Sequence, residues 1–456
     1  MRDLVFLAII GAVILAGLKR PFVFVLLYVY IDIIAPSKLT YGFLTVLPLS
    51  ALAVGLAVLS WLAVDDKADT RVSFRQGLIA LLLAYCAYTT KNADFPVEAL
   101  DKWGWVWKAL AFGLFLPLTL RTRLRIEALL LVVVLSLSAL MVTGGIKTAA
   151  GGGGYGVLQI LVDENSGIYE GSIISTIAIS IIPLILWFTR HGTIFPPDWR
   201  VKLYAYALIF ACLLIPVGTQ ARTGLVCAAL AVLLIIRDAK RKMLWIGGIA
   251  LLGAAAIPFL PSKFTDRMDT IKTYQADASA STRIEVWKWT WEYAKANPMG
   301  GGFEAYRQNF IRYDKVKTDK TDTANATVER TLEVDKGRAY HSAYFEMLGE
   351  QGYPGLAIWL LLNAIGIVRM EVLRRRYRAG DQQWAGGLAT ALQHAHLIYM
   401  LGAAFVGIAF QPFLYMLIGA QIGLDTYLAR RRREAGWKPF LRAKKAGAPE
   451  AAGATA

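Results

Sequence analysis

Apolar runs long enough to cross a lipid bilayer recur along almost the whole sequence, separated by short polar connections. A helix satisfies its own backbone hydrogen bonds inside a bilayer, so repeated apolar runs predict a helical bundle. The expected fold class is all-α, a polytopic transmembrane helical bundle of about 12 or 13 spans with one large loop domain outside the membrane. The predicted spans are 4–18, 21–34, 41–64, 77–88, 105–120, 126–142, 169–188, 203–217, 223–236, 243–260, 353–368, 386–410 and 412–428.

The longest polar stretch runs from about Pro261 to Tyr340 and divides the chain into parts. The pattern predicts an N-terminal transmembrane bundle over 1–260, an external loop domain with catalytic residues over 261–352, and C-terminal transmembrane helices over 353–430. Residues 431–456 end in a segment without a core-forming pattern, which predicts a disordered cytoplasmic tail.

Hydrophobic residues make up 56% of the 456 residues, which excludes a soluble globular protein. The net charge of +16 comes from clusters in alternate loops, which is typical of cytoplasmic loops of membrane proteins and not of a nucleic-acid-binding surface. We therefore expect no nucleic-acid partner, a cytoplasmic C-terminus, and external positions for the loops 89–104, 143–168, 218–222 and 261–352. The basic clusters are Lys19-Arg20, Arg121–Arg125, Arg237–Lys242, Arg374–Arg376 and Arg430–Arg433.

Inside the external loop, Thr282-Arg283-Ile284-Glu285 has the form of a capping box, which predicts a helix from Thr282 to about Ala296. Its tryptophans favour either a helix at the lipid headgroup level or a helix packed within the loop domain. We expect Ile284, Trp287, Trp291 and Ala294 to form one face of it. The polar residues 314–338 are expected to form a mobile lid or loop.

His341 stands where the polar stretch meets the next apolar run, and we expect it to begin a short amphipathic helix. An imidazole titrates near neutral pH, so a histidine at the membrane surface can take a proton from a substrate hydroxyl. The alternative is a structural histidine. We predict that His341 is the catalytic general base.

Arg222 lies in a very short external turn, and Arg283 follows the predicted cap at Thr282. Both are therefore expected at helix N-termini, where a guanidinium group and free N–H groups favour an anion. We predict that the two arginines hold one diphosphate. The alternatives are an Arg222 that reaches lipid headgroups and an Arg283 in an ordinary salt bridge.

Two further residues are secondary candidates for the site. Arg338 precedes His341 by one turn and either shares the anion site or pairs with Glu333 or Asp335, and Glu350 follows in the same segment. His394 and His396 lie inside a span at a spacing that points them to different faces, so we expect hydrogen bonds within the bundle. No metal site and no cofactor are expected.

With these motifs in this order, the chain resembles the O-antigen ligase and polymerase superfamily of bacterial membrane glycosyltransferases. Its opening residues, with 35–43, are similar to the exosortase-associated O-glycosylation ligase branch. The motifs that carry the superfamily resemblance are Gly218-Thr-Gln-Ala-Arg222-Thr-Gly224, Ser281-Thr-Arg283-x-x-x-Trp287, Asn297-Pro298-x-Gly300-x-Gly302-Phe303 and His341-Ser342 followed by Leu348-x-Glu350-x-Gly352-x-x-Gly355.

The resemblance implies a multi-pass protein of the bacterial inner membrane with its loop domain and active site facing the periplasm. It implies transfer of a glycan from undecaprenyl diphosphate to an acceptor hydroxyl, with inversion and without a metal. The family's essential arginines correspond to Arg222 and Arg283, and its catalytic histidine corresponds to His341. The implied partners are the lipid-linked donor, a glycan, lipid or protein acceptor, and membrane lipids. Arg222 stands in Gln-Ala-Arg-Thr instead of the common Ser-x-Ser-Arg.

Two other functions fit parts of this pattern. A polymerase that joins lipid-linked repeat units differs from a ligase only in its acceptor, and the motifs do not separate the two. A polysaccharide or lipid transporter would also be polytopic and basic, but transporters place their ionisable groups near the midplane of the membrane. Here most of the candidate charges lie in external segments, which favours the glycosyltransferase.

Overall fold

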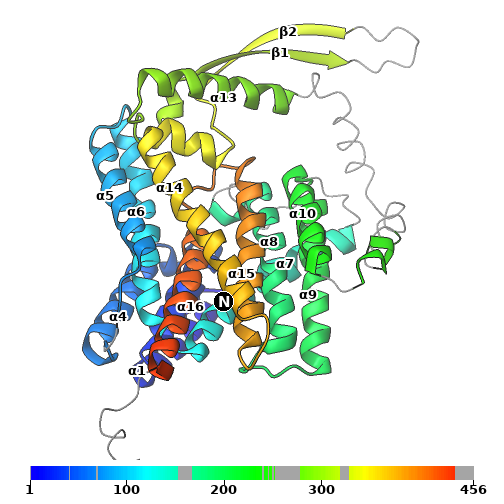
Figure 1. Ribbon diagram of the computed structural model, residues 1–456. Helices are drawn as coiled ribbons and strands as arrows, with labels where there is room; N and C mark the ends of the chain where they lie inside the picture. Colours follow the sequence, from blue (N-terminus) through cyan, green and yellow to red (C-terminus); the bar gives the residue numbers. More distant parts are fainter. Residues whose placement is uncertain are drawn as a thin grey trace, which may run out of the picture.

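The computed structural model describes residues 2–40, 42–67, 70–151, 167–238, 241–244, 246–248, 251, 278–318 and 328–436. Most of them form helices that stand side by side in a bundle (Figure 1). The longer bundle helices are α1 (Arg2–Lys19), α2 (Phe22–Ile34), α4 (Leu49–Val64), α5 (Phe74–Lys91), α6 (Pro96–Thr119), α7 (Arg123–Gly151), α8 (Gly171–His191), α9 (Trp199–Gly218), α10 (Arg222–Asp238), α14 (Ala343–Arg376), α15 (Gln383–Ala403) and α16 (Pro412–Gly436).

The predicted all-α bundle is confirmed. Among the described residues, α7, α8, α9 and α14 are long and apolar enough to cross a membrane, and α2 and α4 are shorter apolar helices. The chain is thus a multi-pass membrane protein. Most of the predicted span 243–260 and the end of the predicted tail lie outside the described residues.

Two predicted spans are too long. Within the span 41–64, a short 3-10 helix at Phe43–Thr45 is followed by an α-helix that begins at Leu49, because Pro48 adopts a non-helical conformation just before α4. The span 386–410 ends as a helix at Ala403, and the chain then turns before Pro412 opens α16. Hydropathy alone did not show these ends, because the turns are as apolar as the helices.

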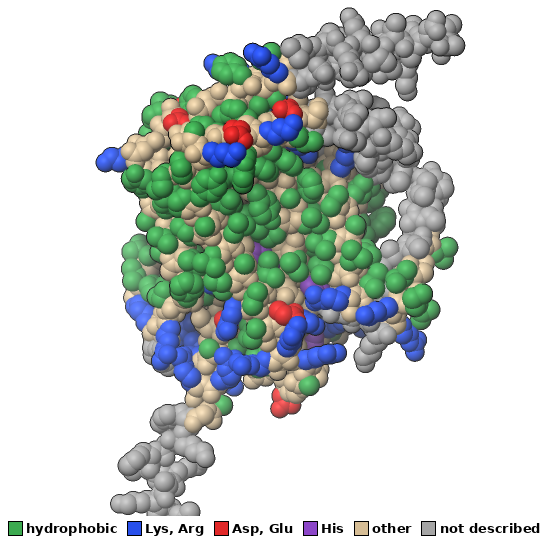
Figure 2. Space-filling model, turned by 45° about the horizontal axis from the view of Figure 1, so that its top comes forward, with side chains coloured by type: hydrophobic (Ala, Val, Ile, Leu, Met, Phe, Trp, Pro, Cys, Tyr) green, Lys and Arg blue, Asp and Glu red, His purple; other side chains and the backbone are tan. Residues whose placement is uncertain are grey.

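The basic clusters gather at one end of the bundle. Figure 2 shows a broad band of hydrophobic side chains with Lys and Arg side chains along its lower rim. Contacts between distant segments hold this end together: Arg430 donates to the carbonyl of Arg121, and Arg432 donates to the Tyr377 hydroxyl at 2.7 Å. Arg125 forms an ion pair with Asp65 at 2.6 Å.

The opposite end of the bundle is capped by α13 (Ala278–Ala296) and a β-hairpin that extends beyond it (Figure 1). Strands β1 (Phe310–Thr318) and β2 (Val328–Lys336) pair antiparallel, with Phe310 opposite Lys336. The prediction of a loop over 314–338 was therefore wrong for the described part of that segment. Its strands alternate apolar and charged residues, as in Thr331-Leu-Glu-Val-Asp335, and the mixed charge obscured that alternation.

The two intramembrane histidines hydrogen-bond within the bundle, as predicted. Nε2 of His394 lies 2.9 Å from the guanidinium of Arg237. On another face of α15, His396 contacts the Asn363 side chain at 2.8 Å and the Gln421 side chain at 3.0 Å.

Candidate functional site

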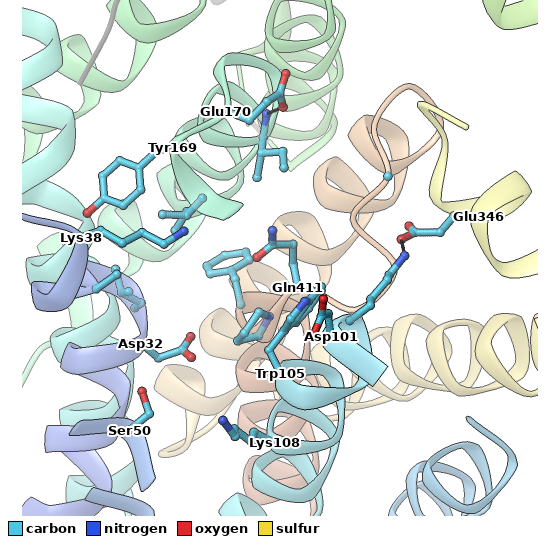
Figure 3. A pocket seen from close by; sticks show the side chains of 18 of the residues that line it. Asp32, Lys38, Ser50, Asp101, Trp105, Lys108, Tyr169, Glu170, Glu346 and Gln411 are labelled. Atoms are coloured by element: carbon cyan, nitrogen blue, oxygen red, sulfur yellow. Dashed lines mark hydrogen bonds and ion pairs between the residues drawn. The ribbon is translucent and has the colours of Figure 1, made fainter. Parts of the chain in front are cut away.

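A cavity of about 1000 Å³ lies between the N-terminal helices and the segment that contains His341. Figure 3 shows its labelled side chains pointing inward from several helices. Both acidic and basic groups line it, so it is suited to a polar ligand. The titratable acidic and basic residues that line it are Asp32, Lys38, Glu98, Asp101, Lys102, Lys108, Glu170, Glu304, Arg307, His341, Glu346 and Glu350.

His341 lines this cavity but does not begin a helix, because α14 starts two residues later at Ala343. Its φ of 48° lies in the left-handed region, which a non-glycine residue adopts at a free-energy cost. Strained residues of this kind persist where the surrounding structure holds them, often at functional sites.

Aromatic packing on both sides of His341 provides that support. The carbonyl of Tyr340 accepts a hydrogen bond from the Trp287 indole N–H at 2.8 Å. The rings of Trp287 and Phe345 stack with centroids 5.0 Å apart. The buried ring of Tyr340 lies against Gly349, where a Cβ would be 2.4 Å from its hydroxyl. Helix α13 thus fixes the backbone on either side of His341.

Partial burial and nearby positive charges keep His341 neutral at physiological pH. Its side chain is exposed to the cavity, yet the surrounding protein removes part of its hydration shell. This desolvation, together with the positive charges of Arg283 and Arg338, lowers the pKa of His341 to about 4. The imidazole is therefore a proton acceptor near pH 7.

Arg283 acts on His341 electrostatically, but its predicted place at a helix N-terminus is wrong. Helix α13 begins at Ala278, so Arg283 lies in its second turn and Thr282 is a fully buried residue within the helix. The preceding residues from Ala278 are compatible with a helix and extend it. The free N–H groups of the helix therefore precede Arg283, and the predicted cap does not form.

The packing face of α13 also differs from the predicted one. Its buried residues recur every four positions at Thr282, Val286, Thr290 and Ala294. The helix packs on α14 and β1, while the predicted face residues Ile284 and Trp291 are exposed.

Arg338 forms an ion pair with Asp335, which is one of the two partners predicted for it. The side chain of Asn309 fixes its backbone: Oδ1 accepts from the Arg338 N–H at 2.9 Å, and Nδ2 donates to its carbonyl at 2.8 Å. Arg338 is thus held at the base of the hairpin, from which its charge reaches His341.

Arg222 begins α10, as predicted, and is half-buried. The turn before it is joined to α8 by a hydrogen bond of 2.8 Å between the hydroxyls of Thr219 and Ser175. Thr219 also contacts Gly171, the neighbour of the cavity residue Glu170. Neither Arg222 nor Arg283 is among the residues that line the cavity. The binding of one diphosphate by both arginines therefore remains a prediction.

Glu350 is part of an ion cluster that sequence reasoning did not find. Nζ of Lys102 lies 2.7 Å from Oε1 of Glu346 and 2.8 Å from Oε1 of Glu350. The three side chains are 11%, 8% and 0% exposed, respectively, so the cluster is buried in the cavity wall. The other oxygen of Glu346 accepts from the N–H of Ala409, and Glu350 accepts from the N–H of Glu304. Lys102 thereby connects α6 to α14 and to two loops.

Two motifs that are far apart in the sequence form one backbone unit. The N–H groups of Gly301 and Gly302 donate to the carbonyls of Gly349 and Glu350 at 3.0 and 2.9 Å. Gly352 bends α14 at this point with a φ of 62°, and a Cβ there would be 2.2 Å from the carbonyl oxygen of Pro298. The glycines are needed because the two backbones touch.

Part of the missed cluster had a visible sequence signal. Glu346 and Glu350 stand four residues apart in the His341 segment, which places them on one helix face. Lys102 had no such signal, because its partners are more than 200 residues away and only the fold brings them together.

Two family models match the chain. Residues 1–193 match a family of unknown function, and residues 207–360 match the O-antigen ligase family. Residues 207–360 thus resemble an O-antigen ligase domain. No curated protein was found to match the chain. The predicted superfamily is confirmed, and the family implies an enzyme that acts on a lipid-linked glycan donor and an acceptor.

The cavity is shared between the two matched regions. His341 and Glu350 belong to the O-antigen ligase domain, as do Arg222 and Arg283. In contrast, 20 of the 33 described residues that line the cavity lie within 1–193. The N-terminal region therefore forms most of the cavity wall in the part of the chain that the structure describes.

Proposed function

We propose that this protein is a bacterial inner-membrane glycosyltransferase that moves a glycan from undecaprenyl diphosphate to an acceptor hydroxyl on the periplasmic side. The observation that carries the proposal is a histidine in the region that matches the O-antigen ligase family, in the wall of a large cavity that is also lined by charged side chains. Helix α13, which contacts the backbone beside His341, caps the end of the bundle away from the basic clusters (Figures 1 and 2), and this supports a periplasmic position for His341.

In the proposed reaction, His341 takes the proton of the acceptor hydroxyl while its oxygen attacks the anomeric carbon of the donor sugar. The bond from that carbon to the diphosphate oxygen breaks, and its electron pair leaves with undecaprenyl diphosphate. Attack from the opposite face inverts the anomeric centre. Arg222 and Arg283 stabilise the charge that develops on the leaving diphosphate, and the reaction needs no metal.

The acceptor distinguishes the two nearest functions. A ligase attaches a finished glycan to a lipid or protein, as the exosortase-associated branch would, whereas a polymerase extends the glycan itself. Mass spectrometry of surface glycoconjugates from a deletion strain tests the proposal. We expect acceptors without the glycan for a ligase, and shortened chains for a polymerase. Unchanged glycoconjugates would contradict both functions, and an accumulation of unflipped donor inside the cell would indicate transport.

The activity should persist in mild acid, because the base stays neutral there. His341 has a pKa lowered to about 4, so kcat/KM should be nearly constant from pH 7 to about 5 and fall as the pH drops through about 4. Arg338→Gln removes one of the charges that lower this pKa, so the acid limb should move to higher pH. A pH profile of kcat/KM measures this, with Arg376→Gln at the far end of α14 as the matched control. An identical acid limb in Arg338→Gln would contradict the assignment.

The activity should depend on the planar geometry of the Arg222 and Arg283 guanidinium groups as well as on their charge. Arg222→Lys and Arg283→Lys should each lower kcat/KM by about tenfold or more, since lysine cannot bind a phosphate with two parallel hydrogen bonds. If they hold one anion, the double substitution should cost less than the sum of the two. Arg200→Lys, at the exposed start of α9, serves as the control. Strictly additive losses would indicate two separate sites.

A further inference from the structure

Lys108 is an unusual cation because it lies within a predicted membrane span and faces the cavity. Five cavity residues of α6 recur at helical spacing, so one face of this helix lines the cavity: Glu98, Asp101, Lys102, Trp105 and Lys108. Lys108 is six residues beyond Lys102, which places it about 9 Å further along the helix, toward the membrane interior. A charge at that depth is costly and usually serves a function.

The other cavity cations are already occupied by protein groups. Lys102 is held by Glu346 and Glu350, and Arg307 lies 3.0 Å from Glu304. Lys38 also has an interaction partner within the protein. For Lys108, the described part of the chain offers the Trp107 ring at 6.0 Å but neither an ion pair nor a hydrogen bond. Its positive charge is therefore available to a ligand.

The surroundings of Lys108 are polar. Figure 3 shows Asp32, Ser50 and Lys108 in the same part of the cavity. Among the described residues, Asp32 makes a single long hydrogen bond of 3.5 Å with Tyr28 and no ion pair with Lys108. Three helices thus bring polar side chains together in this part of the cavity.

We propose that Lys108 is a phosphate-binding residue for the lipid-linked donor and that the N-terminal region of unknown function supplies this subsite. The inference rests on the proposed function and adds to it a residue outside the O-antigen ligase domain. An inverting transfer requires the leaving diphosphate and the base on opposite faces of the anomeric carbon. Lys108 and His341 line the same cavity from different elements, so a donor bound in this cavity can contact both residues.

Binding without turnover tests the proposal. The full chain in nanodiscs of phosphatidylcholine is titrated with geranylgeranyl diphosphate, with geranylgeraniol and with phosphatidylglycerol, and binding is measured by native mass spectrometry. Lys108→Met should weaken binding of the diphosphate by about tenfold or more, because a charge-assisted contact is lost. Lys108→Arg should retain most of the affinity, and geranylgeraniol should bind both variants equally. Lys91→Met, at the exposed end of α5, is the matched control.

Three results of this experiment would bear on the proposed role of Lys108. Equal affinity of wild type and Lys108→Met for the diphosphate would overturn the proposal. Phosphatidylglycerol that binds in a Lys108-dependent way and displaces the diphosphate would show a site for ordinary anionic lipids, which also overturns it. Because binding is measured without chemistry, these failures would leave the glycosyltransferase proposal standing. A Lys108→Met protein that does not fold is replaced by Lys108→Arg and Lys108→Gln, whose difference in affinity carries the same information.

Discussion

His341→Ala should abolish glycan transfer while the protein still inserts and folds in the membrane. Loss of a general base typically lowers the rate by about 10²- to 10⁴-fold. The side chain of His341 faces the cavity, so its removal should leave the packing of α13 on α14 intact. Turnover of a lipid-linked donor by the purified protein in proteoliposomes measures the effect.

The chain provides a matched control for this substitution. His191 ends α8 near the basic end of the bundle and contacts Trp187 instead of the cavity. His191→Ala should therefore keep nearly full turnover. Near wild-type turnover in His341→Ala would exclude a general base at this position, and equal losses in both variants would indicate a general folding defect.

Most of the fold could be predicted from the sequence, because the bilayer leaves few alternatives to a helix. The predicted spans 77–88, 169–188 and 203–217 each coincide with a helix, α5, α8 and α9. The errors occur where that constraint is absent. Outside the membrane, α13 begins before the predicted cap and buries Thr282, and the hairpin depends on pairing between segments separated along the chain.

The features of the candidate site also fall into those that the sequence predicted and those that only the structure shows. His341 was recognisable from its place at the junction of polar and apolar segments, and the structure puts it in the cavity wall. Its left-handed backbone and its lowered pKa were not predictable, because they depend on Trp287, Arg283 and Arg338 in three dimensions. The contribution of the N-terminal region to the cavity wall could not be predicted, for a related reason. Lys102 and Lys108 occupy a helix whose sequence pattern gives no sign of which face lines the cavity.

Lys102→Met should reduce both stability and activity, because it leaves two buried carboxylates without their shared counter-charge. Glu346 and Glu350 are four residues apart on one helix and almost fully buried. Breaking a buried ion pair typically costs about 3–5 kcal/mol, whereas an exposed pair contributes about 0–1 kcal/mol. Lys295→Met is the control, since its ion pair with Glu292 has the same length of 2.7 Å but is exposed to solvent. Thermal unfolding in detergent should show a large shift for Lys102→Met and almost none for Lys295→Met.

A second set of variants separates folding from positioning. Adding Glu346→Gln and Glu350→Gln to Lys102→Met removes the uncompensated charges, so thermal stability should return. If Lys102 also positions the His341 segment, kcat should stay low in this triple variant, because the contacts from α6 to α14 and to the loop at Ala409 are weakened. The pH profile of its kcat/KM should also shift, since His341 would no longer be held beside Arg283 and Arg338. Full recovery of kcat with an unchanged pH profile would mean that the cluster serves stability alone, since the geometry of the base would then be independent of Lys102.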